Sequence, residues 1–109
     1  MSGGGMQLDG NQQKYKEKKE FVISKQVYRS GTSIGANIAE SIYAQSEADY
    51  INKLKISLKE ASETKYWLEL LHETEYINDV QFDSLHDENS KLIGTLVNII
   101  NSTKNNNNV

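Results

Sequence analysis

A chain of 109 residues with a formal net charge of −3 forms one domain at most, and 37% apolar residues is a small supply for a self-sufficient core, so we expect self-association. The absence of cysteine excludes a disulfide framework, a thiolate metal site and a cysteine nucleophile, and it suits the reducing cytoplasm, where we expect the protein. No apolar run approaches the ~18–20 residues that span a bilayer, and no secretory signal opens the chain, so we expect no membrane partner.

Both ends of the chain are expected to lack regular structure. Residues 1–13 open with three glycines and show no apolar period, which favours a flexible leader or an artificial extension. The tail at 104–109 is a short asparagine tract that we expect to be disordered. The domain should therefore span 14–103. Its predicted fold class is all-α, an antiparallel up-down helical bundle, because proline is absent and no segment alternates with period two.

The first predicted helix runs from a start between Lys16 and Phe21 to about Tyr43, and the start is vague because no good capping residue directly precedes Phe21. An apolar stripe with steps of four residues marks one side of it: Ile34, Ile38 and Ile42.

A line of small residues lies on the same helix. Gly31 and Gly35 are one turn apart, and Ala39 follows after one more turn. A glycine inside a helix costs about 0.5–1 kcal/mol relative to alanine. This line therefore predicts that something approaches the helix closely.

A polar row accompanies the small residues, with steps of four, four and three: Arg29, Ser33, Asn37 and Glu40. No histidine or cysteine stands near enough in sequence to activate Ser33, so nucleophilic catalysis is poorly supported. A buried or interfacial hydrogen-bond network fits better, in which Asn37 fixes the helix register.

The second predicted helix starts sharply at a capping-box pattern, Ser46 to Asp49, and runs to about Glu73. Apolar residues cover two sides of it, which predicts neighbours on both: Ile51, Leu54, Leu58, Ala61 and Leu68, then Ile56, Trp67, Leu70 and Leu71. Trp67 should be substantially buried, with its indole N–H bonded across a helix interface. The carboxylates of Glu60 and Glu63 lie one turn apart; acid–base or metal chemistry would use such a pair, but salt bridges or subunit contacts are the better interpretation.

The third predicted helix follows a short turn, starts at a second capping pattern from Asn78 to Gln81, and should end near Thr103. Its apolar face holds Leu85, Leu92, Leu96 and Ile99. Two spacings loosely resemble a di-metal bundle site, namely Glu69-x-x-His72 and Asp83-x-x-His86. Solvent-facing histidines at the bundle end are the better interpretation. We therefore predict no metal, no cofactor and no catalytic residue.

Positive charge is concentrated near the N-terminus. Residues 1–45 carry a net +2, against −3 for residues 46–78 and −2 for residues 79–109. The candidate nucleic-acid contacts are the basic residues of this region: Lys14, Lys16, Lys18, Lys19, Lys25 and Arg29. Phosphates on RNA or DNA would suit this cluster, with Tyr15 and Tyr28 as stacking platforms, whereas a solvated helix start is the plainer alternative. The overall acidity argues against generic nucleic-acid binding.

Three ordered motifs carry a resemblance to a known family: 29–40, then Ala44-Gln-Ser46 with Asp49-Tyr50, and 58–68. Over residues 18–103 the chain resembles the four-helix-bundle proteins encoded in intervening sequences of bacterial 23S rRNA genes, the S23-type family. The resemblance implies an antiparallel four-helix bundle that assembles into a ring, typically a pentamer, and has a non-enzymatic role associated with nucleic acid. The accessory variability proteins of diversity-generating retroelements are similar in fold, which implies a reverse transcriptase as a further partner. The positions that would make helix-packing or subunit contacts are Gly31, Ser33, Ile34, Gly35, Asn37, Ile38, Glu40, Glu60, Glu63 and Trp67.

One departure from the family pattern concerns the N-terminus. The family has an additional amphipathic helix before the position of Lys19, and residues 1–18 of this chain lack its apolar stripe. The family's first helix is therefore expected to be missing or replaced, which would uncover an apolar groove. Another subunit or a partner helix would fill this groove, or the first helix of this chain extends towards its N-terminus.

Two functions follow as hypotheses. The leading one is a non-enzymatic, ring-forming bundle that binds RNA or DNA through its basic first helix, as an accessory to an rRNA intervening element or a reverse transcriptase. The alternative is a protein-interaction scaffold whose apolar groove accepts a partner helix. Binding should weaken steeply with salt in the first case and not in the second.

Overall fold

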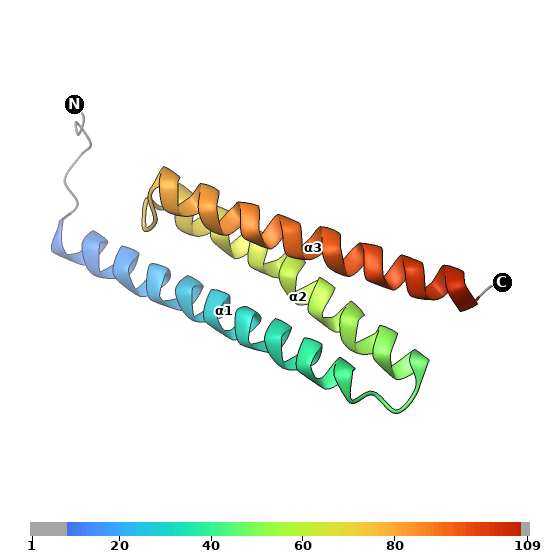
Figure 1. Ribbon diagram of the computed structural model, residues 1–109. Coiled ribbons are helices and arrows are strands. Elements are labelled where there is room, and N and C mark those ends of the chain that lie inside the picture. Colours follow the sequence, from blue (N-terminus) through green and yellow to red (C-terminus); the bar gives the residue numbers. More distant parts are fainter. Residues whose placement is uncertain (1–8, 108–109) are drawn as a thin grey trace.

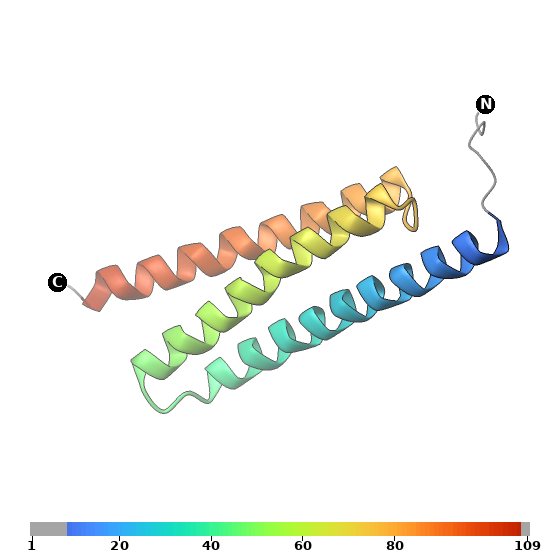
Figure 2. The ribbon, with the colours of Figure 1, turned by 180° about the vertical axis from the view of Figure 1, so that it is seen from behind.

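In the computed structural model, which describes residues 9–107, three long helices follow one another: α1 (Gly10–Ile42), α2 (Glu47–Glu73) and α3 (Asp79–Asn107). They run up, down and up, with α2 between the other two (Figures 1 and 2). The all-α class is confirmed, and the described residues contain no strand. The helices form an elongated layer measuring 62 × 23 × 16 Å. None of these helices combines the length and apolar character that crossing a membrane requires.

The start of α1 differs from the predicted one. Asp9 caps the helix: its Oδ1 accepts from the Gln12 N–H at 2.8 Å, and Gln12 Oε1 accepts from the Asp9 N–H at 3.2 Å. This reciprocal cap sets the helix start at Gly10, well before the predicted start between Lys16 and Phe21. The first helix thus extends towards the N-terminus, which was one of the two alternatives for this segment. Residues 1–8 of the predicted leader lie outside the described residues.

The other helix ends agree better with the sequence. Ser46 Oγ accepts from the Asp49 N–H at 3.0 Å, and Asn78 and Gln81 cap α3 reciprocally at 2.8 and 2.9 Å. The helix α3 continues to Asn107, so the predicted end near Thr103 is wrong and the tail is helical as far as residue 107. Residues 108–109 lie outside the described part.

The seam between α1 and α2 follows a heptad pattern, with buried side chains at alternating steps of three and four. The α2 side is Leu54, Ser57, Ala61, Thr64, Leu68 and Leu71, and the buried residues of α1 are Glu20, Ile23, Ser30, Ile34 and Ser41. Three of the seam residues, Ser30, Ser57 and Ala61, are 0% exposed. Ser57 Oγ donates to the backbone oxygen of Ile34 at 3.1 Å, a bond that a short side chain can make only when the two helices are close.

The close helix approach predicted at the glycines is therefore found at other residues, Ser30, Ser57 and Ala61. Gly31 and Gly35 are exposed, and a Cβ built on either would meet no atom within 4 Å. They lie beside the seam, and the small residues within it are three serines and an alanine, namely Ser30, Ser41, Ser57 and Ala61. Among residues 9–107, no neighbouring helix approaches these two glycines closely.

The second helix pair, α2 and α3, holds a cluster of buried apolar side chains: Leu54, Leu96 and Ile100, with Ile38 of α1 packed against it. Asn89 Nδ2 donates to the Ala61 carbonyl at 2.9 Å. This bond links α3 to α2, as the bond of Ser57 links α2 to α1. The backbones of α1 and α3 do not approach each other over residues 9–107. A groove of about 260 Å³ separates them, floored by Thr64 and Leu68.

We expect overpacking at the seam to destabilise the fold. Ala61→Leu should lower the free energy of unfolding by about 1–3 kcal/mol, because a larger side chain must force α1 and α2 apart. The matched change Ala48→Leu, at an exposed position in the first turn of α2, should change it by less than about 0.5 kcal/mol. Urea unfolding followed by circular dichroism measures both. Equal midpoints for the two variants would show that the seam is not tightly packed.

Candidate nucleic-acid interface

Part of the basic cluster lies on the side of α1 that faces away from α2. Lys14, Lys18, Phe21, Lys25 and Tyr28 follow steps of four and three residues, which places them on one helix face. We call these five residues the outer stripe. All five are exposed, Phe21 by 63% and Tyr28 by 78%. Lys25 Nζ lies 5.6 Å from the centroid of the Phe21 ring, a cation–π contact.

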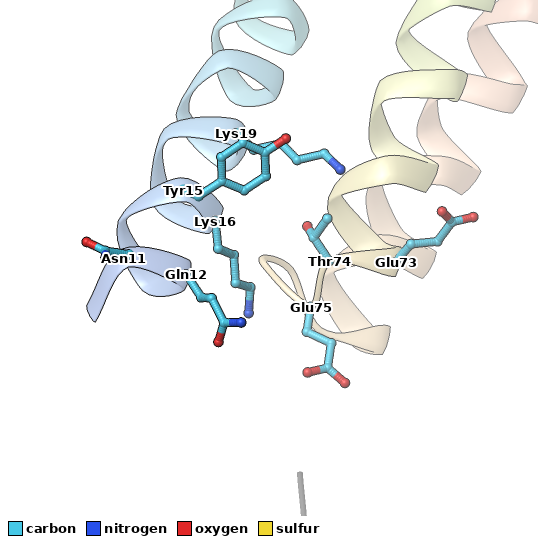
Figure 3. A pocket seen from close by; sticks show the side chains of 8 residues that line it. All are labelled: Asn11, Gln12, Tyr15, Lys16, Lys19, Glu73, Thr74 and Glu75. Carbon is cyan, nitrogen blue, oxygen red and sulfur yellow. The ribbon is translucent and has the colours of Figure 1, made fainter. Parts of the chain in front are cut away.

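Two of the predicted contact residues, Lys16 and Lys19, lie on another face of α1. They extend towards the end of α2 and line a cleft of about 730 Å³ with Tyr15 (Figure 3). The opposite side of this cleft is formed by Glu73, Thr74 and Glu75, with the two carboxylates pointing away from the lysines (Figure 3). The local charge is therefore mixed, and these two lysines do not add to the outer stripe.

Arg29 is engaged with α2. Its guanidinium lies 3.5 Å from Glu60 Oε2 and 3.7 Å from Glu63 Oε2, so one cation on α1 bridges two acids on α2. The Glu60 side chain is only 15% exposed, and Arg29 supplies its charge partner slightly beyond hydrogen-bond distance. This matches the salt-bridge interpretation of the two glutamates. It also removes Arg29 from the free basic surface.

The rest of the polar row makes one contact within α1 and one contact to α2. Asn37 Nδ2 donates to the Ser33 carbonyl at 2.9 Å, within α1, and Glu40 pairs with Lys53 of α2 at 3.2 Å. Between the helices of this chain, the side-chain-to-backbone hydrogen bonds come from Ser57 and Asn89. The interfacial role of Asn37 stays a prediction. In the sequence, Ser57 and Asn89 could have been found as polar residues at heptad positions that are otherwise apolar.

Trp67 is half-buried and meets the Tyr66 ring edge-on at 5.1 Å between centroids. Its indole nitrogen is buried and has no acceptor among the described residues, in contrast to the predicted bond across a helix interface.

The two histidines are partly buried and contribute to the α2–α3 junction. His72 Nε2 lies 2.6 Å from Asp79 Oδ1, and the His72 ring stacks on Phe82 at 4.2 Å between centroids. The His86 ring is tilted against Phe82 at 5.1 Å between centroids. Among residues 9–107 no three His, Cys, Asp or Glu side chains are grouped as a metal site would require.

Lys55 of α2 and Lys104 of α3 lie close together, which the sequence pattern did not indicate. A side-chain hydrogen bond with Lys55, and then the repulsion between the two positive charges, lowers the pKa of Lys104 from its ordinary value. Both residues are exposed, and their separation in sequence hides the pairing.

Comparison with known proteins agrees with the motifs. The family model described as 23S rRNA-intervening sequence protein matches residues 8–98. The chain belongs to this family. The match includes the whole of α1, so the segment from Gly10 onward is part of the family alignment.

A solved structure is also similar to this family member. It is a protein with unknown function from the S23 ribosomal protein family of Bacteroides thetaiotaomicron. The two chains are 60% identical, with a TM-score of 0.73, over 77% of this chain and 78% of the other. Among curated proteins, none matches.

The two kinds of basic residue should differ in their effect on stability. Arg29→Gln should lower the free energy of unfolding by about 1 kcal/mol, because Glu60 loses its partner in a nearly buried position. Lys25→Gln, an equal change of charge on the outer stripe, should alter it by less than about 0.5 kcal/mol. Urea midpoints compare them. An equal loss in both variants would mean that the Arg29 bridge contributes nothing specific.

Proposed function

We propose that this chain is a non-enzymatic helical protein that binds nucleic acid through the outer stripe. The observation that carries the proposal is the sorting of charges on α1. Arg29 pairs with two acids of α2, and Lys16 and Lys19 line a cleft with Glu73 and Glu75, whereas three lysines share the face turned away from α2. Glu17 borders the stripe and already accepts a hydrogen bond from Gln13 at 3.2 Å. A concentrated positive face on a protein of net charge −3 suits phosphates, because their neutralisation releases counterions.

The partner we propose is RNA, with DNA as the alternative of the same chemistry. The family description refers to a 23S rRNA intervening sequence, which supports an rRNA intervening element as the source. A retroelement reverse transcriptase is the protein partner to test beside it.

We further propose that the chain assembles with itself, as a ring of about five subunits. It exposes 7669 Å², compared with about 6,100 Å² expected for a compact monomer of this mass. The second half of α1 presents Gly31 and Gly35 beside the exposed Ile42 and Tyr43. A helix of another subunit in the groove between α1 and α3 would complete a four-helix arrangement. The outer stripe would then be repeated in each subunit, which multiplies weak phosphate contacts.

The groove also supports a second candidate function, a protein-interaction scaffold. Val27, Gly31 and Ile34 line one wall and Leu85 and Leu92 the other. This surface suits the apolar face of a partner helix. Such binding would not weaken with salt, in contrast to phosphate binding.

The stripe lysines should control RNA affinity and its salt dependence. In the triple variant Lys14→Gln/Lys18→Gln/Lys25→Gln, the plot of log affinity against log salt concentration for a single-stranded RNA should become less steep. Each lost phosphate contact reduces the magnitude of the slope by about 0.7, so three lost contacts reduce it by about 2. Fluorescence anisotropy with a labelled 20-nucleotide RNA at four salt concentrations measures it.

The matched control is Lys16→Gln/Lys19→Gln/Lys65→Gln, which removes the same charge away from the stripe. It should retain most of the wild-type affinity and slope. Equal losses of affinity in the two triple variants would show that only the net charge of the protein matters. Unchanged RNA affinity in the stripe variant would exclude the outer stripe as the binding site.

Substitutions at Gly35 should separate folding stability from assembly. Gly35→Ala should stabilise the isolated chain by about 0.5–1 kcal/mol, since its Cβ meets no atom. Gly35→Leu should block assembly, while Gly94→Leu on α3, where a Cβ also meets nothing, should leave it intact. Light scattering coupled to size-exclusion chromatography measures the mass. A wild-type monomer at all concentrations would contradict the ring, and normal assembly of Gly35→Leu would place the interface elsewhere.

A further inference from the structure

We propose that the outer stripe takes single-stranded nucleic acid, with unpaired bases stacked on Phe21 and Tyr28. This rests on the proposed function and specifies the form of its ligand. Both rings stand in solvent, at 63% and 78% exposure, on the face that carries Lys14, Lys18 and Lys25. Exposed aromatic platforms set among cations are the means by which proteins hold single strands without reading their sequence.

The spacing of the two rings is wider than one base step of a stacked strand. Phe21 and Tyr28 are seven residues apart, about 10.5 Å along the helix axis. Stacked bases of one strand rise about 3.4 Å each, so neighbouring bases of a regular helix would not match the two platforms. Bases splayed from a single strand can reach them, whereas the bases of a duplex are stacked and paired already. A duplex would therefore use the lysines and leave the rings without a role.

The surroundings of Phe21 suit a whole nucleotide. A shallow hollow of about 430 Å³ adjoins its ring and is lined by Lys14, Glu17, Lys18 and Val22. Lys25 lies 5.6 Å from the ring centroid. A base on the ring would thus have ammonium groups within reach of its own phosphate.

A protein partner fits this face less well. Protein–protein interfaces are depleted of lysine, and three of the five stripe residues are lysines. Burying them without acids would leave their charges unpaired. The apolar groove, which lies between α1 and α3, is the surface that suits a partner helix.

The test compares one labelled 12-nucleotide purine-rich RNA, free and annealed to its complement, by fluorescence anisotropy at low salt. Phe21→Ala/Tyr28→Ala should weaken single-strand binding at least about tenfold and duplex binding less than about twofold. Phe21→Leu/Tyr28→Leu, which keeps apolar bulk without a π-face, should lose as much. Tyr66→Ala, an exposed aromatic on α2, is the matched control and should bind both RNAs like the wild type.

The outcomes separate this inference from the proposed function. Unchanged single-strand binding in the double alanine variant, with loss in the stripe-lysine variant, would overturn base stacking and keep nucleic-acid binding. Retained affinity in the leucine variant would also overturn it. Equal losses for the two RNAs, together with a changed mass in light scattering, would show that the rings form a subunit interface. No RNA binding by the wild type would remove the proposed function itself.

Discussion

The close packing of α1 on α2 is the constraint on which the rest of the structure depends. Ser30, Ser57 and Ala61 are completely buried, and Ser57 donates to the backbone of Ile34. Large side chains at these positions would hold the helices apart and remove that bond. Because the bond joins a side chain to a backbone atom, it fixes the sliding of one helix along the other. The rotation of α1 about its axis follows from the buried heptad positions.

That rotation sorts the charges of α1. With Ile23, Ser30 and Ile34 turned towards α2, Arg29 lies at the edge of the seam, within 4 Å of two glutamates. Lys18 and Lys25 are turned outward. A basic segment that looks uniform in sequence thus becomes one structural ion pair and one free positive face. The electrostatic potential outside the protein depends on the free face, because pairing with α2 cancels the contribution of Arg29.

The small core leaves apolar surface without a partner. Because α2 lies between α1 and α3, its two sides are covered, whereas each outer helix has one neighbour. Phe21 and Tyr28 stay in solvent on one side, and the groove beside Leu68 stays open on another. These surfaces differ in chemistry. The first is interleaved with lysines and suits nucleic acid, and the second is mainly aliphatic and suits a helix, so both proposed interactions can exist on one small chain.

Sequence patterns were sufficient to predict the helical class, two of the helix caps and the family. The caps at Ser46 and Asn78, the apolar positions Leu54 and Leu68, and the all-α class depend on neighbours a few residues away, which a linear pattern records. Asp9 and Gln12 have the same capping spacing, but no apolar period accompanies them, so the pattern did not indicate a helix start there. The tertiary structure alone decided which small residues are buried. Ser30 and Ser57 look like surface residues in a sequence, because their burial comes from a partner helix more than twenty residues away and not from any apolar character of their own. For the same reason, only the structure could separate Arg29 from the lysines.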